Sequence, residues 1–157
     1  MSGLKLPALD PASLEPRKGS GYPEPFDQIA TTRSKKGLGD ALGLKNFGVN
    51  LTTLPPGMAS AQRHWHATQD EFVYIVEGEL TLITDAGEQV LTPGMVAGFP
   101  AGVADGHHLV NKSAHDAVFL EVGDRTAGDV GSYPDIDLEA RDKDGRWHFF
   151  HKDGTPY

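Results

Sequence analysis

Short strand-like runs, each ended by a turn signal after four to eight residues, constrain the fold of this chain more than any other feature. Eight such runs fall at residues 47–54, 62–66, 71–76, 79–85, 88–91, 96–99, 107–111 and 117–122. Dipeptides such as Glu77-Gly78, Pro93-Gly94 and Ala86-Gly87 stand in the breaks between them. Short strands at regular spacing indicate an antiparallel β-sandwich or barrel. No helical period competes with them in this part of the chain.

The length and composition agree with one all-β domain. The chain has 157 residues, of which 19 are Gly and 11 are Pro, an excess that favours many short elements joined by tight turns. We expect residues 45–123 to form the β-barrel core. Residues 1–44, rich in Pro and Gly, are expected to be an extended arm that wraps the domain or a neighbouring subunit, with a short helical turn near residues 25–31. Residues 124–157 are expected to be an extension that packs on the barrel and adds an edge strand within 146–151.

Charge and cysteine content exclude several classes of partner. The net charge of −8 argues against binding to nucleic acid or to an anionic membrane surface, because neither attracts an acidic protein. The sequence contains no Cys, so any metal must be held by nitrogen and oxygen ligands and no disulfide can form. No stretch has the length of a transmembrane helix or the apolar block of a signal peptide, and cytoplasmic residence is therefore expected.

The segment from His64 to Glu71 carries the chemistry. On a strand, residues two apart point to the same face and lie roughly 6.6 Å apart, so His64 and His66 can converge on one ion while Trp65 faces the other way. A helix would separate the two imidazoles by about 200°. Glu71 follows a short polar turn and opens the next antiparallel strand, which carries its carboxylate back beside the histidines. Imidazoles with a carboxylate suit one divalent ion of Zn, Mn, Fe, Ni or Co.

Two spaced motifs resemble those of the cupin superfamily. The first is Gly57-x6-His64-x-His66-x4-Glu71-x6-Gly78, and the second is Gly94-x5-Pro100-x-Gly102-x4-His107-x3-Asn111. Within that superfamily, the chain is similar to small single-domain bacterial cupins of the mannose-6-phosphate isomerase-like and polyketide-cyclase-like kinds. The resemblance spans about half of the chain, and it implies a single-domain antiparallel jelly-roll β-barrel with a metal held by three histidines and a glutamate.

The second motif departs from the family pattern and leaves the fourth ligand open among three residues. Two extra residues follow Gly102, so a count from the glycine arrives at Asp105, whereas a count back from Asn111 arrives at His107. We favour His107, because the piece before Asn111 lies on a strand where spacing fixes direction, and insertions collect in loops. His108 would then point outward or toward a subunit interface.

Three functions fit a metal site with an open coordination position. The first is a metal-dependent isomerase, epimerase or lyase acting on a small sugar-like or carboxylated substrate. The second is a non-catalytic module that binds a small molecule as a sensor or carrier, and the third is an iron-dependent dioxygenase. The catalytic residues are not identified by the sequence, because the same fold and ligands serve unrelated reactions. A homodimer is expected, since jelly-roll sheets leave edge strands that need covering.

Overall fold

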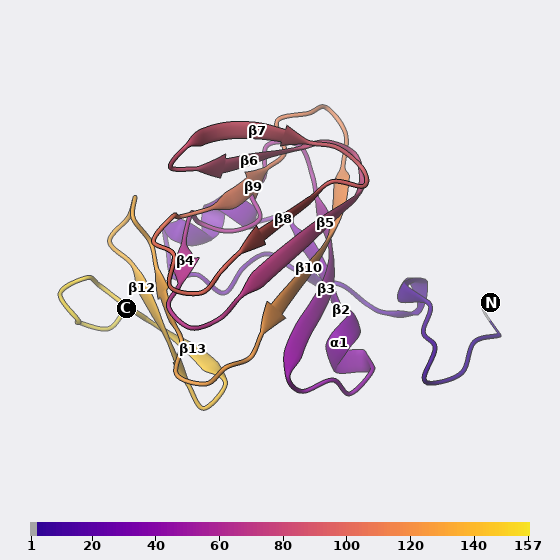
Figure 1. Ribbon diagram of the computed structural model, residues 1–157, viewed down its shortest axis with the longest axis horizontal. Coiled ribbons are helices and arrows are strands. Elements are labelled where there is room, and N and C mark those ends of the chain that lie inside the picture. Colours follow the sequence, from indigo (N-terminus) through magenta and orange to yellow (C-terminus); the bar gives the residue numbers. More distant parts are fainter. Residues whose placement is uncertain (1–2) are drawn as a thin grey trace.

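Antiparallel β-strands of at most eight residues build most of the computed structural model, which describes residues 3–157 (Figure 1). In chain order the strands are β1 Arg17–Lys18, β2 Ser34–Gly37, β3 Phe47–Leu54, β4 Trp65–His66, β5 Glu71–Glu77, β6 Leu80–Thr84, β7 Gly87–Leu91, β8 Val96–Phe99, β9 His108–Val110, β10 Ala117–Asp124, β11 Val130–Ser132, β12 Glu139–Lys143 and β13 Arg146–Phe150. Within residues 3–157, helical structure is limited to 3₁₀ turns at Pro11–Ser13 and Phe26–Ala30 and to α1 at Leu38–Ala41. None of these helices is long and apolar enough to cross a bilayer.

The strands form three sheets that make up two facing layers. One layer is a six-stranded sheet with the order β1-β2-β3-β10-β5-β8. The other layer contains a three-stranded sheet, β7-β6-β9, and a four-stranded sheet, β13-β12-β11-β4. Isolated bridges join the segments before β4 to the segments around β9, at Ala59 with Val110 and at His64 with His107. This arrangement fits the expected jelly-roll and confirms the all-β class.

Alternating side chains place an apolar core between the layers at one end of the barrel. On β5, Val73 and Ile75 are buried while Phe72 and Tyr74 are about two-fifths exposed on the other face. Phe119 of β10 is 1% exposed and points to the same interior. The core cluster comprises Leu54, Val73, Ile75, Leu80, Leu82, Leu91, Leu109, Ala117 and Phe119. Apolar burial on this scale stabilises a fold by about 25 cal/mol per Å² of area removed from water.

The strands expected within residues 45–123 are confirmed, several of them to within one residue. The run at 47–54 is β3 and the run at 96–99 is β8, and only the run at 62–66 is much shorter than expected, since β4 covers two residues. The short helical turn expected near residues 25–31 is present at Phe26–Ala30, and the edge strand expected within 146–151 is β13.

The two ends of the chain contain more regular structure than the sequence indicated. The segment expected to be an arm without regular elements adds β1 and β2 to the six-stranded sheet, where β2 pairs with β3. Beyond residue 123, β11 and β12 were not expected, and β11 pairs with β4. A second small core fastens these ends to each other, with Tyr22 and Phe26 packed on Tyr133, Leu138 and Ala140. Short strands of mixed polarity carry no clear period, so only tertiary pairing reveals them.

The turn after β5 depends on the absence of a side chain at Gly78. Its φ is +76°, and a Cβ there would lie 2.7 Å from the Asp116 carbonyl oxygen and 2.8 Å from the Ala117 Cα. At Gly57 φ is similar, +81°, but a Cβ added at that position would have no neighbouring atom within 4 Å. An alanine at Gly57 would therefore suffer only backbone strain, whereas an alanine at Gly78 would suffer the same strain and a steric clash as well.

We expect Gly78→Ala to lower the free energy of unfolding by about 3 kcal/mol, because it adds a clash with rigid backbone to the left-handed strain. Gly57→Ala should lower it by only about 1 kcal/mol, since it carries the strain alone. Urea denaturation of both variants measures the difference. Equal losses would show that the close approach at Gly78 does not matter.

Candidate metal centre

A reciprocal pair of main-chain hydrogen bonds sets two histidines side by side. The His64 amide donates to the His107 carbonyl oxygen at 3.2 Å, and the His107 amide donates to the His64 carbonyl oxygen at 2.9 Å. The two imidazole centroids lie 5.1 Å apart. Residues 43 positions apart are thereby held as cross-strand neighbours at the point where the second layer's two sheets meet.

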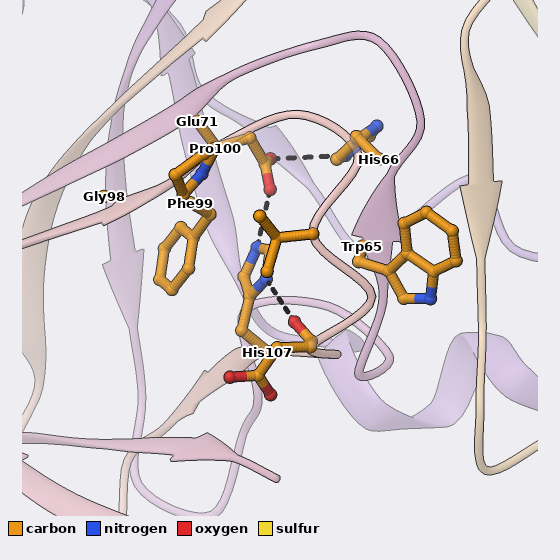
Figure 2. A pocket seen from close by; sticks show the side chains of 9 residues that line it. Trp65, His66, Glu71, Gly98, Phe99, Pro100 and His107 are labelled. Carbon is orange, nitrogen blue, oxygen red and sulfur yellow. Dashed lines mark hydrogen bonds and ion pairs between the residues drawn. The ribbon is translucent and has the colours of Figure 1, made fainter. Parts of the chain in front are cut away.

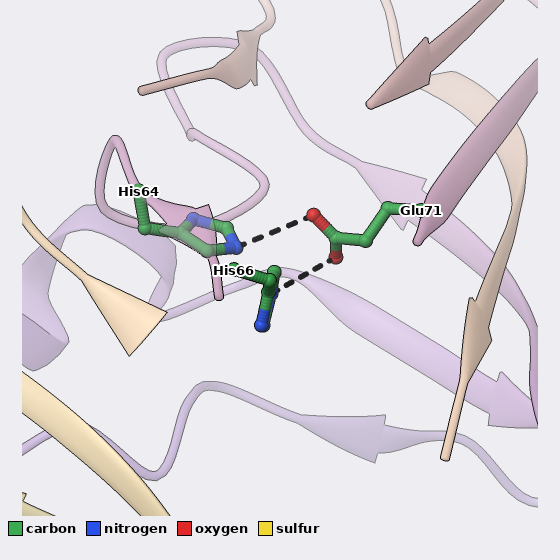
Figure 3. A group of neighbouring side chains, drawn as sticks. All are labelled: His64, His66 and Glu71. Atoms are coloured by element: carbon green, nitrogen blue, oxygen red, sulfur yellow. Dashed lines mark ion pairs between the residues drawn. The ribbon is translucent and has the colours of Figure 1, made fainter. Parts of the chain in front are cut away.

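His66 and Glu71 reach the same place from β4 and from the start of β5. His66 Nε2 lies 3.5 Å from Glu71 Oε1, and His64 Nε2 lies 3.6 Å from Glu71 Oε2 (Figure 3). One donor atom from each of the three side chains can be chosen so that all lie within 4.8 Å of one another. All three side chains are half-buried, so the donors face a sheltered space. This set of two imidazoles and a carboxylate could hold a divalent metal ion.

Each imidazole is oriented through its other nitrogen. His64 Nδ1 lies 2.8 Å from the Gln62 carbonyl oxygen, and His66 Nδ1 lies 2.5 Å from Asp129 Oδ2. These acceptors each take a hydrogen bond from Nδ1, so each Nε2 is the ring atom that faces Glu71 and can bind either a proton or a cation. A carboxylate or carbonyl behind a ligating histidine orients the ring and raises its basicity. The chemistry of the donor set therefore fits a metal.

Asp129 is held in place for this role. The residue is fully buried, and its Oδ1 accepts hydrogen bonds from the Thr68 amide at 2.7 Å and the Thr68 hydroxyl at 3.0 Å. Its other oxygen is left for His66. A buried carboxylate needs such compensation, because its desolvation is otherwise expensive.

The ionisable groups of the centre shift one another's pKa values. Burial acts to raise the pKa of Glu71, but the neighbouring His107, His64 and His66 outweigh it and hold that pKa well below its usual range. Burial likewise acts to lower the pKa of His66, and the charges and hydrogen bonds of Glu71 and Asp129 reverse this and raise it to about 9. The site therefore attracts positive charge, from protons or from a cation.

His107 contacts Glu71 directly. Its Nε2 lies 2.7 Å from Glu71 Oε2, and its ring stacks on Phe99 with centroids 3.5 Å apart and planes 2° from parallel (Figure 2). The two other residues weighed for the fourth position line the cavities at the centre, but each has a different hydrogen-bond partner. His108 Nδ1 lies 2.9 Å from the Ala61 carbonyl oxygen, and Asp105 Oδ1 accepts a hydrogen bond from the Asp85 amide at 2.7 Å.

The centre lies between two cavities. A small one of about 80 Å³ is lined by Trp65, His66, Glu71, Phe99 and His107. A large, open one of about 1090 Å³ is lined by His64, His66, Glu71 and His107 at one end and by residues of β1 and β2 at the other. A small molecule can thus approach the donors from the barrel interior. Trp65, expected to face away from the histidines, lines the small cavity. Its neighbour Arg63 pairs with Asp135 at 2.7 Å.

Several residues around the cavity were not identified from the sequence. Tyr133 stacks on the His64 ring at 5.6 Å between centroids, and burial raises the pKa of its phenol, which stays protonated and can donate a hydrogen bond. Glu121 of β10 lies on the inward face that Phe119 shares, and it lines the large cavity. Glu121 had a visible signal, because it is a charged residue at an inward position of an apolar strand. Asp129 and Tyr133 had none.

Comparisons with known proteins agree with this geometry. Residues 50–123 match the family model described as a cupin domain. Over 96% of both chains, the protein is 45% identical to a sugar phosphate isomerase from a cupin superfamily of Silicibacter pomeroyi, with a TM-score of 0.92. Over 80% of both chains, it is 31% identical to a proposed sugar phosphate isomerase from Acidithiobacillus ferrooxidans, with a TM-score of 0.72.

A more distant likeness concerns the fold alone. A polyketide cyclase from Streptomyces resistomycificus is 20% identical, with a TM-score of 0.59, over 74% of this chain and 78% of the other. No curated protein matches the chain.

We expect Asp129→Asn to weaken binding of a divalent metal about 10- to 100-fold, because the amide no longer fixes the His66 ring as a carboxylate does. Competition with a chromophoric chelator for Zn²⁺ measures the affinity. Asp153→Asn, a change to an exposed carboxylate near the C-terminus, is the matched control and should leave it unchanged. An unchanged affinity in Asp129→Asn would mean that metal binding does not depend on the carboxylate behind His66.

Proposed function

The chain belongs to the cupin superfamily, and on that premise we propose that it is a metal-dependent isomerase acting on a small sugar-like or carboxylated substrate. The observation that carries the proposal is the convergence of His64, His66 and Glu71 at the end of a cavity of about 1090 Å³. The likeness to a sugar phosphate isomerase over nearly the whole chain supports the reaction class. An epimerase or lyase would use the same groups.

We propose that His107 completes the metal ligands with His64, His66 and Glu71. Its Nε2 already lies 2.7 Å from Glu71 Oε2, and the stacked Phe99 ring restrains its rotation. Its Nδ1 faces the Asp105 carbonyl oxygen, at 3.4 Å, which leaves Nε2 to bind. A divalent cation bound between this Nε2 and the half-buried Glu71 carboxylate would take the place of their direct contact.

Zn, Mn, Fe, Ni or Co at such a site supplies a Lewis acid that polarises a carbonyl or hydroxyl oxygen. The protein's own side chains orient the substrate. The protonated Tyr133 hydroxyl is suited to donate to a substrate oxygen, and the apolar wall at Phe119 and Leu109 limits water in the inner part of the cavity. Lower local polarity strengthens each of these contacts.

Glu121 is the group that we assign to proton transfer. In the β5–β10 register, Gly123 faces Glu71 and Glu121 faces Val73, so Glu121 is the diagonal neighbour of Glu71 on the same inward face. Such neighbours lie about 7–8 Å apart, which leaves room for a substrate carbon between them. In an aldose–ketose isomerisation, Glu121 would take the proton from C2 and return it to C1, while the hydroxyl proton passes from O2 to O1. No oxidant or reductant is needed.

Elemental analysis of protein purified without added metal, combined with an isomerase assay, tests the proposal. We expect about one divalent ion per chain and interconversion of an aldose phosphate and its ketose, with exchange of the C2 hydrogen in D₂O followed by NMR. His66→Ala and His107→Ala should lose the metal and at least about 100-fold in rate. His115→Ala changes an exposed histidine and should retain both.

Two outcomes would contradict the proposal in different ways. Metal-loaded protein that binds sugars without exchanging hydrogen would be a binding module rather than an enzyme. Oxygen consumption after iron loading would instead indicate a dioxygenase.

We also propose that the protein is a homodimer. The outer face of β5 and its edge neighbour β8 exposes Phe72, Tyr74, Val76 and Val96, each between 40% and 54% exposed. Tyr74 and Val96 are direct cross-strand partners, so the side chains form one apolar strip beside a free sheet edge. A second copy related by a two-fold axis would cover both the strip and the edge.

Light scattering during size-exclusion chromatography measures the mass. We expect a dimer at micromolar concentration and a monomer for Tyr74→Lys, because a charge in the centre of an apolar contact is costly to bury. Val90→Lys, at an exposed position of β7, serves as the control and should stay dimeric. A monomeric wild-type protein would refute the dimer.

A further inference from the structure

Cationic side chains gather at the end of the large cavity that faces the metal centre. Arg17 of β1 and Lys35 of β2 are direct Cα partners, and Lys35 is in turn the partner of Thr52, which is fully buried on the inward face of β3. Arg33, two residues before Lys35, lies on the same face. All three line the cavity. The protein has a net charge of −8, so a cluster of three cations in one cavity is unusual for it and indicates a negatively charged ligand.

The carboxylates nearby do not balance these cations. Glu121 pairs with Lys35 and also accepts a hydrogen bond from Asn50 at 3.2 Å. Asp40, which also lines the cavity, is engaged by Arg125 at 2.5 Å. Among residues 3–157, Glu121 is the one carboxylate that forms an ion pair with Arg17, Arg33 or Lys35, and the charge of Arg17 acts on Asp40 without a direct pair. Like charges directly opposite on neighbouring strands destabilise a sheet, and the single carboxylate of Glu121 offsets only one of the two charges of the Arg17–Lys35 pair.

Hydrogen bonds hold the Arg33 side chain in place, but none of them comes from a negatively charged group. Its guanidinium donates to the Gly19 carbonyl oxygen at 2.7 Å and to the Ser60 carbonyl oxygen, both neutral acceptors. Its Nε is buried and has no hydrogen-bond partner among residues 3–157. Burial is the main cause that lowers the pKa of this guanidinium, the charge of Glu121 opposes that shift in part, and the charge of Arg17 adds to it. A pre-positioned cation of this kind can hold an anion with little loss of side-chain entropy.

We propose that Arg17, Arg33 and Lys35 form an anion subsite that binds the phosphate group of a phosphorylated substrate whose other end reaches the metal centre. The proposal rests on the proposed function for the role of the metal end, and it adds the residues that would bind the phosphate group of the substrate. A dianionic phosphomonoester matches the excess of cations better than a single carboxylate does. Glu121 and Asn50 lie between the subsite and Glu71 on the inward face, where a chain of hydroxyl groups would meet them.

Calorimetric titration of the metal-loaded protein with glucose 6-phosphate, glucose and inorganic phosphate tests the subsite. We expect glucose 6-phosphate to bind at least about tenfold more tightly than glucose, since charge-assisted hydrogen bonds discriminate to this degree. Inorganic phosphate should bind alone and compete with the ester. Added salt should weaken both more than it weakens glucose.

Variants assign the effect to the named residues. Arg17→Gln and Lys35→Gln should each weaken the ester about tenfold or more and leave metal content unchanged. Arg17→Gln should also leave glucose affinity unchanged, whereas Lys35→Gln in addition releases Glu121. Lys112→Gln removes an equal charge at an exposed pair with Glu88, outside the cavity lining, and should match the wild type. Because Arg17 makes no hydrogen bond within residues 3–157 through its side chain, Arg17→Gln is expected to fold normally.

The outcomes separate this inference from the isomerase proposal. Binding of the ester that depends on Arg17, without isomerisation, would uphold the subsite and overturn the enzyme. Isomerisation with equal affinity for glucose and its phosphate would uphold the enzyme and overturn the subsite. Inorganic phosphate that binds without competing, or an Arg17→Gln variant that behaves like Lys112→Gln, would also overturn the subsite.

Discussion

The paired main-chain hydrogen bonds between His64 and His107 are the contact on which the rest of the structure depends. They join the three-stranded and four-stranded sheets into one layer, and in doing so they bring two imidazoles to the mouth of the barrel. Glu71 meets both from the opposite layer. Without this bridge, Glu71 would keep only His66 of its three imidazole partners, and a half-buried carboxylate with fewer partners is less favourable. The same pair of hydrogen bonds thus joins the two sheets and places the histidines beside Glu71.

The barrel interior divides into two chemically different ends. The end around Ile75 and Phe119 is apolar and supplies most of the buried core. The other end keeps polar side chains on the same inward faces, with Glu71 and Glu121 continuing the rows begun by Ile75 and Phe119. Because the apolar core is close-packed and rigid, the neighbouring polar cavity stays open and its charged side chains keep their positions. The N-terminal strands β1 and β2 line one side of this cavity, and they contribute Arg17 and Lys35.

The sequence predicted the central fold well because its strands carry strong local signals. Alternation on β5 and glycine-containing turns at Gly78 and Gly94 locate strands whatever the tertiary context. β1, β2, β11 and β12 lack such signals, since they are short and polar and are strands only by virtue of their partners. The arm expected from the sequence to be an extended wrap is therefore partly an integral section of the main sheet.

For the site, the sequence alone determined that His64, His66 and Glu71 share a face and suit a divalent ion, because strand periodicity fixes side-chain direction over a few residues. It narrowed the fourth ligand to His107, His108 or Asp105, and His107 stays a prediction for metal analysis to test. Only the tertiary structure decided that Asp129 supports His66 from 63 residues away, and that Arg17, Lys35 and Glu121 line one cavity. Such pairings depend on how sheets fold over one another, and no local pattern in the chain encodes that.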